Sequence, residues 1–72
     1  MSRINAKERN EETVRLAIVN WLSTKPYSPS FRDLVKETGL SLGTVHSACR
    51  DLRENGVINY LDGVARTIRI SK

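Results

Sequence analysis

The chain has 72 residues, of which 39% are hydrophobic and 28% are charged, with a formal net charge of +4 and an isoelectric point near 9.7. This length allows a single domain with a small core, and the composition is typical of a folded chain rather than a disordered one. The longest apolar run, Leu16–Val19, is too short to span a membrane, and one cysteine with one histidine cannot form a disulfide or a zinc site.

The first predicted helix covers residues 6–24. Asn5 and Glu8 match a capping box, in which the two residues exchange hydrogen bonds between side chain and backbone at the helix start. Apolar side chains recur at helical spacing and predict a wide core-facing stripe, which consists of Val14, Ala17, Ile18, Trp21 and Leu22. The prolines in residues 25–29 then end the helix. We expect residues 1–5, which precede it, to be flexible.

Residues 31–54 predict a helix-turn-helix. Ser30 and Asp33 match a second capping box, which starts the first of the two helices. Gly39 can adopt the left-handed conformation that closes a helix, and Ser41 can cap the helix that follows. This second helix has a core stripe of Val45, Ala48, Cys49 and Leu52. Two short amphipathic helices joined by a glycine-containing turn form the motif whose second helix lies in the major groove of DNA.

Residues 57–70 have the pattern of a β-hairpin. Both halves are rich in β-branched and aromatic residues, and Asp62-Gly63 between them is a strong signal for a two-residue turn. A turn of this kind pairs Val57 with Ile68 and places Tyr60 on the opposite face of the hairpin. Three helices followed by a hairpin predict a mainly α fold, the winged helix-turn-helix, with the whole chain as one domain.

The candidate DNA contacts lie on the second helix of the helix-turn-helix, on the face opposite to its core stripe. The basic net charge fits a polyanion as partner. Arg50 can pair with guanine O6 and N7, unless it forms an ordinary surface ion pair with Glu54. Gly43 lets the helix backbone come close to phosphate or base edges, or it is a tolerated helix glycine. His46 is either a DNA contact or a passive edge residue. The candidates from this helix are Gly43, Thr44, His46, Ser47, Arg50 and Arg53.

The hairpin and the start of the helix-turn-helix supply further candidates. Arg66 and Arg69 lie in the second half of the hairpin, which in winged proteins commonly touches phosphate or the minor groove. An ordinary solvated hairpin is the alternative. Ser30 and Arg32 complete the candidate surface at the start of the helix-turn-helix.

Several stretches resemble the N-terminal DNA-binding domain of LexA-type repressors. They are Tyr27–Asp33, Gly39–Ser41, Thr44–His46, Asn55–Ile58 and Asp62–Ile70, and the resemblance covers about residues 14–70. It implies a winged helix-turn-helix that binds double-stranded DNA as a transcriptional repressor. It also implies that the base-reading positions lie in the first two turns of the recognition helix, at Leu42, Gly43, Thr44, His46 and Ser47. The recognition residues differ from the family's, and these 72 residues include no self-cleaving serine–lysine domain, so neither the operator nor control by self-cleavage carries over.

We therefore expect a sequence-specific double-stranded DNA-binding protein, a small transcriptional regulator of the repressor kind from a bacterium, a phage or a mobile element. We expect it in the cytoplasm, associated with the nucleoid. The main alternative is a winged-helix module that binds a protein partner and little or no nucleic acid, and a third is recognition of RNA or an unusual duplex. No metal set, phosphate loop or nucleophile motif appears, so we expect no enzyme, cofactor, metal or small-molecule ligand.

Leu16 and Val19 form the candidate surface for a dimer or a partner. Both lie on the side of the first helix opposite to Val14 when the helix is viewed end-on. A single helix-turn-helix reads only a few base pairs, and two-fold dimers solve this by placing two recognition helices about 34 Å apart on one duplex. We expect a homodimer through this pair on a palindromic site, although exposed apolar pairs are also common on ordinary surfaces.

Overall fold

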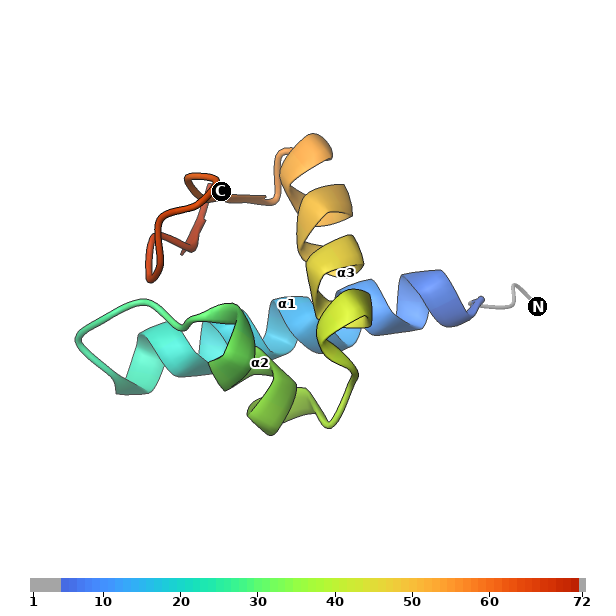
Figure 1. Cartoon of the computed structure of the whole chain (residues 1–72), viewed down its shortest axis with the longest axis horizontal. Helices are drawn as coiled ribbons and strands as arrows, with labels where there is room; N and C mark the ends of the chain where they lie inside the picture. The colour runs from blue at the N-terminus through green and yellow to red at the C-terminus, as the bar shows by residue number, and fades with distance from the viewer. Residues whose placement is uncertain (1–4, 72) are drawn as a thin grey trace.

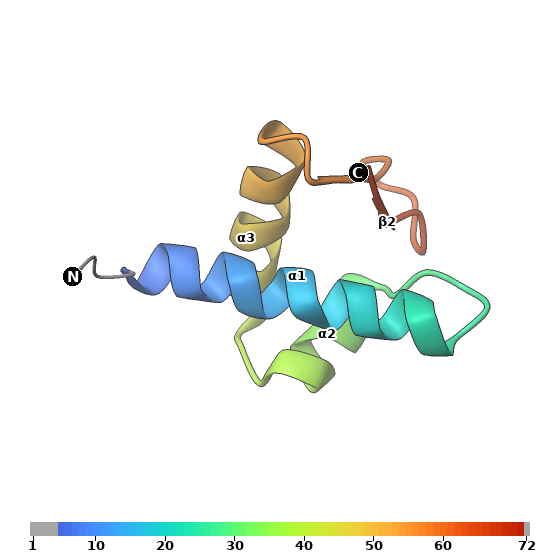
Figure 2. The same cartoon turned by 180° about the vertical axis from the view of Figure 1, so that it is seen from behind.

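The computed structural model describes residues 5–71. It contains three helices and a two-stranded antiparallel sheet, in the order α1 (Ala6–Thr24), α2 (Phe31–Thr38), α3 (Leu42–Glu54), β1 (Ile58–Asn59) and β2 (Arg69–Ile70) (Figure 1). Seen from behind, α1 lies in front of α2 and α3 (Figure 2). The predicted mainly α architecture of three helices and a hairpin is confirmed. Of the stretch expected to be flexible, residues 1–4 lie outside the described residues.

Each helix begins at the N-cap predicted from the sequence. Asn5 caps α1 and Ser30 caps α2, each in a reciprocal capping box with the acidic residue three positions later. Ser41 caps α3 by accepting a hydrogen bond from the backbone N–H of Thr44 at 3.2 Å. Gly39 closes α2 with a φ of 75°, a left-handed conformation that costs glycine little. Local sequence signals therefore set the helix boundaries.

The core lies where the three helices and the wing, residues 57–70, meet. Leu34 of α2 and the α3 stripe are buried together with residues of α1 and the wing; this cluster includes Val14, Ile18, Val45, Ala48, Cys49, Leu52, Ile58, Tyr60 and Ile68. The helical phases predicted for α1 and α3 are therefore confirmed. Burial also raises the pKa of the Cys49 thiol to about 12, which leaves it protonated and inert.

The wing differs from the predicted hairpin. β1 and β2 have two residues each and pair Ile58 with Ile70 and Asn59 with Arg69. The predicted register, with a two-residue turn and Val57 opposite Ile68, is wrong. Between the two strands runs a longer connection, residues 60–68, which we call the wing loop.

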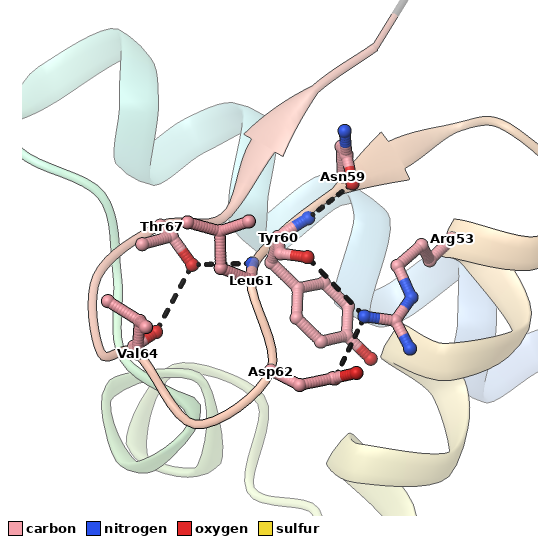
Figure 3. A network of polar contacts seen from close by, with 7 residues as sticks. All are labelled: Arg53, Asn59, Tyr60, Leu61, Asp62, Val64 and Thr67. Atoms are coloured by element: carbon pink, nitrogen blue, oxygen red, sulfur yellow. Dashed lines mark hydrogen bonds and ion pairs between the residues drawn. The ribbon is translucent and has the colours of Figure 1, made fainter.

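Burial explains the changed register. In the predicted register Ile58 and Tyr60 would share one face of the hairpin while Ile68 lay on the other, yet all three side chains are buried against the helices. The wing loop makes this possible because the backbone N–H of Leu61 donates to Thr67 Oγ1 at 2.9 Å instead of to a strand carbonyl (Figure 3). The burial of core side chains, and not the type of turn, therefore decides the register of the two strands.

Candidate nucleic-acid interface

The outer face of α3 is exposed along its length. Its core stripe packs against α1 and α2, so the opposite face points away from both helices. The exposed residues of α3 are Leu42, Gly43, His46, Ser47, Arg50 and Glu54, and the partly buried ones are Thr44, Asp51 and Arg53. A helix that presents small, polar and basic side chains away from its own core can enter a DNA groove.

The first turn of α3 combines a cap with a glycine. The Ser41 hydroxyl donates to Thr44 Oγ1 at 2.8 Å while it accepts from the Thr44 backbone N–H, so both side chains are fixed at the helix start. Gly43 is different, because no heavy atom of the described residues, apart from its chain neighbours and the backbone of its own helix, lies within 4 Å of the position that its Cβ would take. Neither the packing nor the backbone conformation requires glycine at this position. A close approach by another molecule, such as DNA, would require glycine here.

On the wing side of α3 lies a row of aromatic rings. His46 packs against Phe31 of α2 with ring centroids 4.2 Å apart, and Phe31 meets Tyr60 of the wing edge-on at 5.4 Å. A cavity of about 390 Å³ opens beside them, between α3, the start of α2 and the wing loop. Leu42 and Arg32 also line this cavity. The arrangement brings the predicted residues Leu42, His46 and Arg32 to one groove.

On the other side of α3 lies the first part of α1. A hollow of about 350 Å³ is lined there by Lys7 and Asn10 of α1 together with the α3 residues Gly43, Thr44 and Ser47. Lys7 Nζ lies 3.5 Å from Asp51 Oδ2 of α3. The sequence analysis missed Lys7 and Asn10, because only the packing of α1 on α3 brings them to this surface. A cation in the first turn of α1 is the signal that could have indicated Lys7.

The basic candidates fall into two groups. Arg32, Arg50 and Arg69 are exposed and form no ion pair with another described residue. Arg53, which is partly buried, and Arg66, which is also exposed, do form ion pairs: Arg53 Nη1 donates to Asp62 Oδ1 at 2.9 Å, and Arg66 Nη1 donates to Asp33 Oδ2 at 2.9 Å. Ser30, the remaining candidate, is the N-cap of α2 and its hydroxyl accepts from the Asp33 backbone N–H at 3.0 Å.

The candidate dimer surface lies elsewhere. Leu16 and Val19 of α1 are 52% and 39% exposed, on the face of α1 opposite to the stripe that packs on α3. Neither residue lines the two hollows beside α3, to which α1 contributes Lys7 and Asn10. The structure therefore does not bring the apolar pair of α1 close to the candidate DNA contacts.

The comparison with protein families decides the class of domain. A family model described as a winged helix-turn-helix DNA-binding domain matches residues 13–59, more than half of the chain. The chain belongs to this family. The winged helix-turn-helix match spans α2, α3 and β1 with most of α1, and it supports binding to double-stranded DNA. No curated protein sequence matches the chain significantly. Among the described residues, no helix has both the length and the apolar character needed to cross a bilayer.

Proposed function

We propose that this winged helix-turn-helix chain is a small transcriptional repressor, similar to LexA-type repressors, that binds a specific sequence of double-stranded DNA in a bacterium or phage. The observation that supports the proposal most strongly is the outer face of α3. It presents Gly43, Ser47 and Arg50 to solvent, while the opposite side of the same helix is buried in the core. Such a repressor would act on the genome in the cytoplasm.

In this proposal α3 lies in the major groove. Arg50 reads a guanine through two hydrogen bonds, and Ser47 donates to or accepts from a base edge. Thr44 and Gly43 lie at the helix N-terminus, where backbone N–H groups favour a phosphate. Arg32 and Arg69, both exposed, contact the phosphates on either side of the groove.

Selection from random duplexes at physiological salt tests this function, and we expect a defined consensus. Arg50→Ala should weaken binding to the selected site by about 1–3 kcal/mol and relax one base position. Arg69→Ala is the matched control and should weaken all duplexes alike while reducing the salt dependence. A pool without a consensus, or an Arg50→Ala variant with the wild-type base preference, would contradict base reading by α3 and favour a protein-binding module.

A homodimer through Leu16 and Val19 is a separate proposal. A two-fold contact would make each of the two residues meet its own copy and would place two recognition helices on the two halves of a palindromic site. Light scattering of the wild type should give twice the monomer mass, and Leu16→Glu with Val19→Glu should give a monomer that loses binding to the palindromic site while it keeps the helical circular-dichroism signal. A monomeric wild type at the highest soluble concentration would exclude this dimer.

A further inference from the structure

The wing loop has little backbone support of its own. β1 and β2 share only the pairs Ile58–Ile70 and Asn59–Arg69, and the Ser71 backbone N–H adds a bond to the Val57 carbonyl at 2.9 Å. Two strands of this length do not define the position of a nine-residue loop. Contacts made by side chains must therefore hold residues 60–68 in place.

Arg53 holds one end of the wing loop. Its guanidinium lies 4.2 Å from the centroid of the Tyr60 ring, and Nη1 donates to the Tyr60 carbonyl at 3.4 Å and to Asp62 Oδ1 at 2.9 Å (Figure 3). Stacking and hydrogen bonds use the planar group together, a combination that lysine cannot reproduce. Arg53 thus fastens the loop to the last turn of α3.

Arg66 holds the other end. Its backbone has a φ of 59°, a left-handed conformation that costs a residue with a side chain about 1–2 kcal/mol. From there Nη1 donates to the Ser28 carbonyl at 3.2 Å and to Asp33 Oδ2 at 2.9 Å, and the guanidinium lies 5.1 Å from the centroid of the Tyr27 ring. The loop is fastened by this residue to the start of α2.

The start of α2 is also closed to a phosphate at this point. The Asp33 carboxylate accepts from the Ser30 backbone N–H at 3.0 Å, so it already occupies the place of an anion at this helix N-terminus. The same carboxylate neutralises Arg66. The Arg66 guanidinium is exposed but already has an anionic partner in the protein, whereas Arg32 and Arg69 form no ion pair with another described residue.

We propose that Arg53 and Arg66 are positioning residues that fix the wing loop relative to α3, and that the DNA phosphates are bound by other cations such as Arg69. The role in DNA binding rests on the function proposed above, but the fastening of the loop does not. The two arginines act from opposite ends of residues 60–68, so together they set the distance and direction of the wing from the recognition helix.

Hydrogen exchange without DNA tests the fastening. Arg66→Gly removes the side chain while it keeps a residue that tolerates a φ of 59°, and Asp33→Asn removes the charge that holds Arg66 but retains a capping oxygen. Both variants should speed exchange of the Leu61 and Val64 backbone N–H groups several-fold, with exchange in the centre of α3 unchanged. Arg69→Ala is the matched control, which should leave the wing loop at the wild-type rate. Wild-type exchange of the loop in Arg66→Gly and Asp33→Asn would overturn the proposal.

The salt dependence of binding to the selected duplex tests the role toward DNA. Arg66→Gly should weaken binding about two- to fivefold, the range expected from loss of an exposed ion pair, with the wild-type slope of log K against log salt. Arg69→Ala should lower that slope by about one. A slope lowered by one in Arg66→Gly would make Arg66 a phosphate contact and overturn this part. A wild type that binds no duplex would refute the proposed function. The exchange rates would still show whether Arg66 holds the wing loop in place.

Discussion

The imidazole of His46 lies against the ring of Phe31, with ring centroids 4.2 Å apart and planes inclined by 34°. The contact joins α3 to the start of α2, yet His46 stays exposed. One side chain can therefore pack within the protein and still offer its ring nitrogens to a base or a phosphate.

Two substitutions separate these roles of His46. His46→Phe keeps a ring on Phe31 but removes both nitrogens, whereas His46→Ala removes the ring. If His46 contacts DNA, both variants should lose about 1–3 kcal/mol of specific binding, and only His46→Ala should also lose about 0.5–1.5 kcal/mol of stability. Affinity and urea unfolding measure the two effects. Wild-type affinity in His46→Phe would show that only packing matters.

Gly43→Ala should raise stability and lower DNA affinity. The free energy of unfolding should increase by about 0.5–1 kcal/mol, because alanine is the better helix former and its methyl group meets no described atom within 4 Å other than its chain neighbours and the backbone of its own helix. Binding to the selected duplex should weaken by about 1–3 kcal/mol, the usual cost of an extra methyl group in a packed contact. A more stable variant with unchanged affinity would show that no DNA atom approaches this position.

Leu52→Ala should destabilise the domain by about 2–5 kcal/mol, because Leu52 is 5% exposed at the end of the α3 stripe, in one cluster with Ile58 and Ile68 of the wing. A domain of this size has little stability to lose, so a loss of this magnitude should leave much of the variant unfolded. Leu61→Ala is the control, since Leu61 is 63% exposed and its loss should change stability by less than about 0.5 kcal/mol. Thermal unfolding of both variants checks this prediction, and equal effects would contradict the assigned core.

Asp33 should make stability depend on acid pH. The hydrogen bond from the Ser30 backbone N–H, and then the nearby Arg66 guanidinium, hold the pKa of Asp33 below its usual value. A carboxyl group with a lowered folded pKa stabilises the fold above its unfolded pKa, near 3.9, and this contribution disappears as the pH falls through the folded pKa. Unfolding free energies between about pH 5 and pH 2 should therefore fall less in Asp33→Asn than in the wild type. Parallel curves would show that Asp33 is not linked to folding.

The sequence predicted those parts of the fold that local signals determine. Asn5, Ser30 and Ser41 cap their helices through bonds to residues three positions away, and such spacing can be seen in a sequence. The wing register could not be predicted in this way, since it follows from the shared burial of Tyr60 and Ile68 against helices.

The same limit applies to the candidate site. The exposed face of α3 follows from helical phase, so Ser47 and Arg50 were found where the structure presents them. The ion pair of Arg66 could not be predicted because its partner Asp33 is 33 positions away, and Lys7 was missed because only the packing of α1 brings it beside α3. A pattern of single residues contains no information on such distant pairs.

Chemical-shift mapping with isotope-labelled protein and the selected duplex tests most directly whether the outer face of α3 binds DNA. We predict that the largest changes in the amide spectrum fall on residues 42–50, with further changes at Lys7 and Arg69. The amides around Leu16 and Val19 should stay unchanged. Changes confined to that outer face of α1, with none in residues 42–50, would contradict the assignment of α3 as the recognition helix.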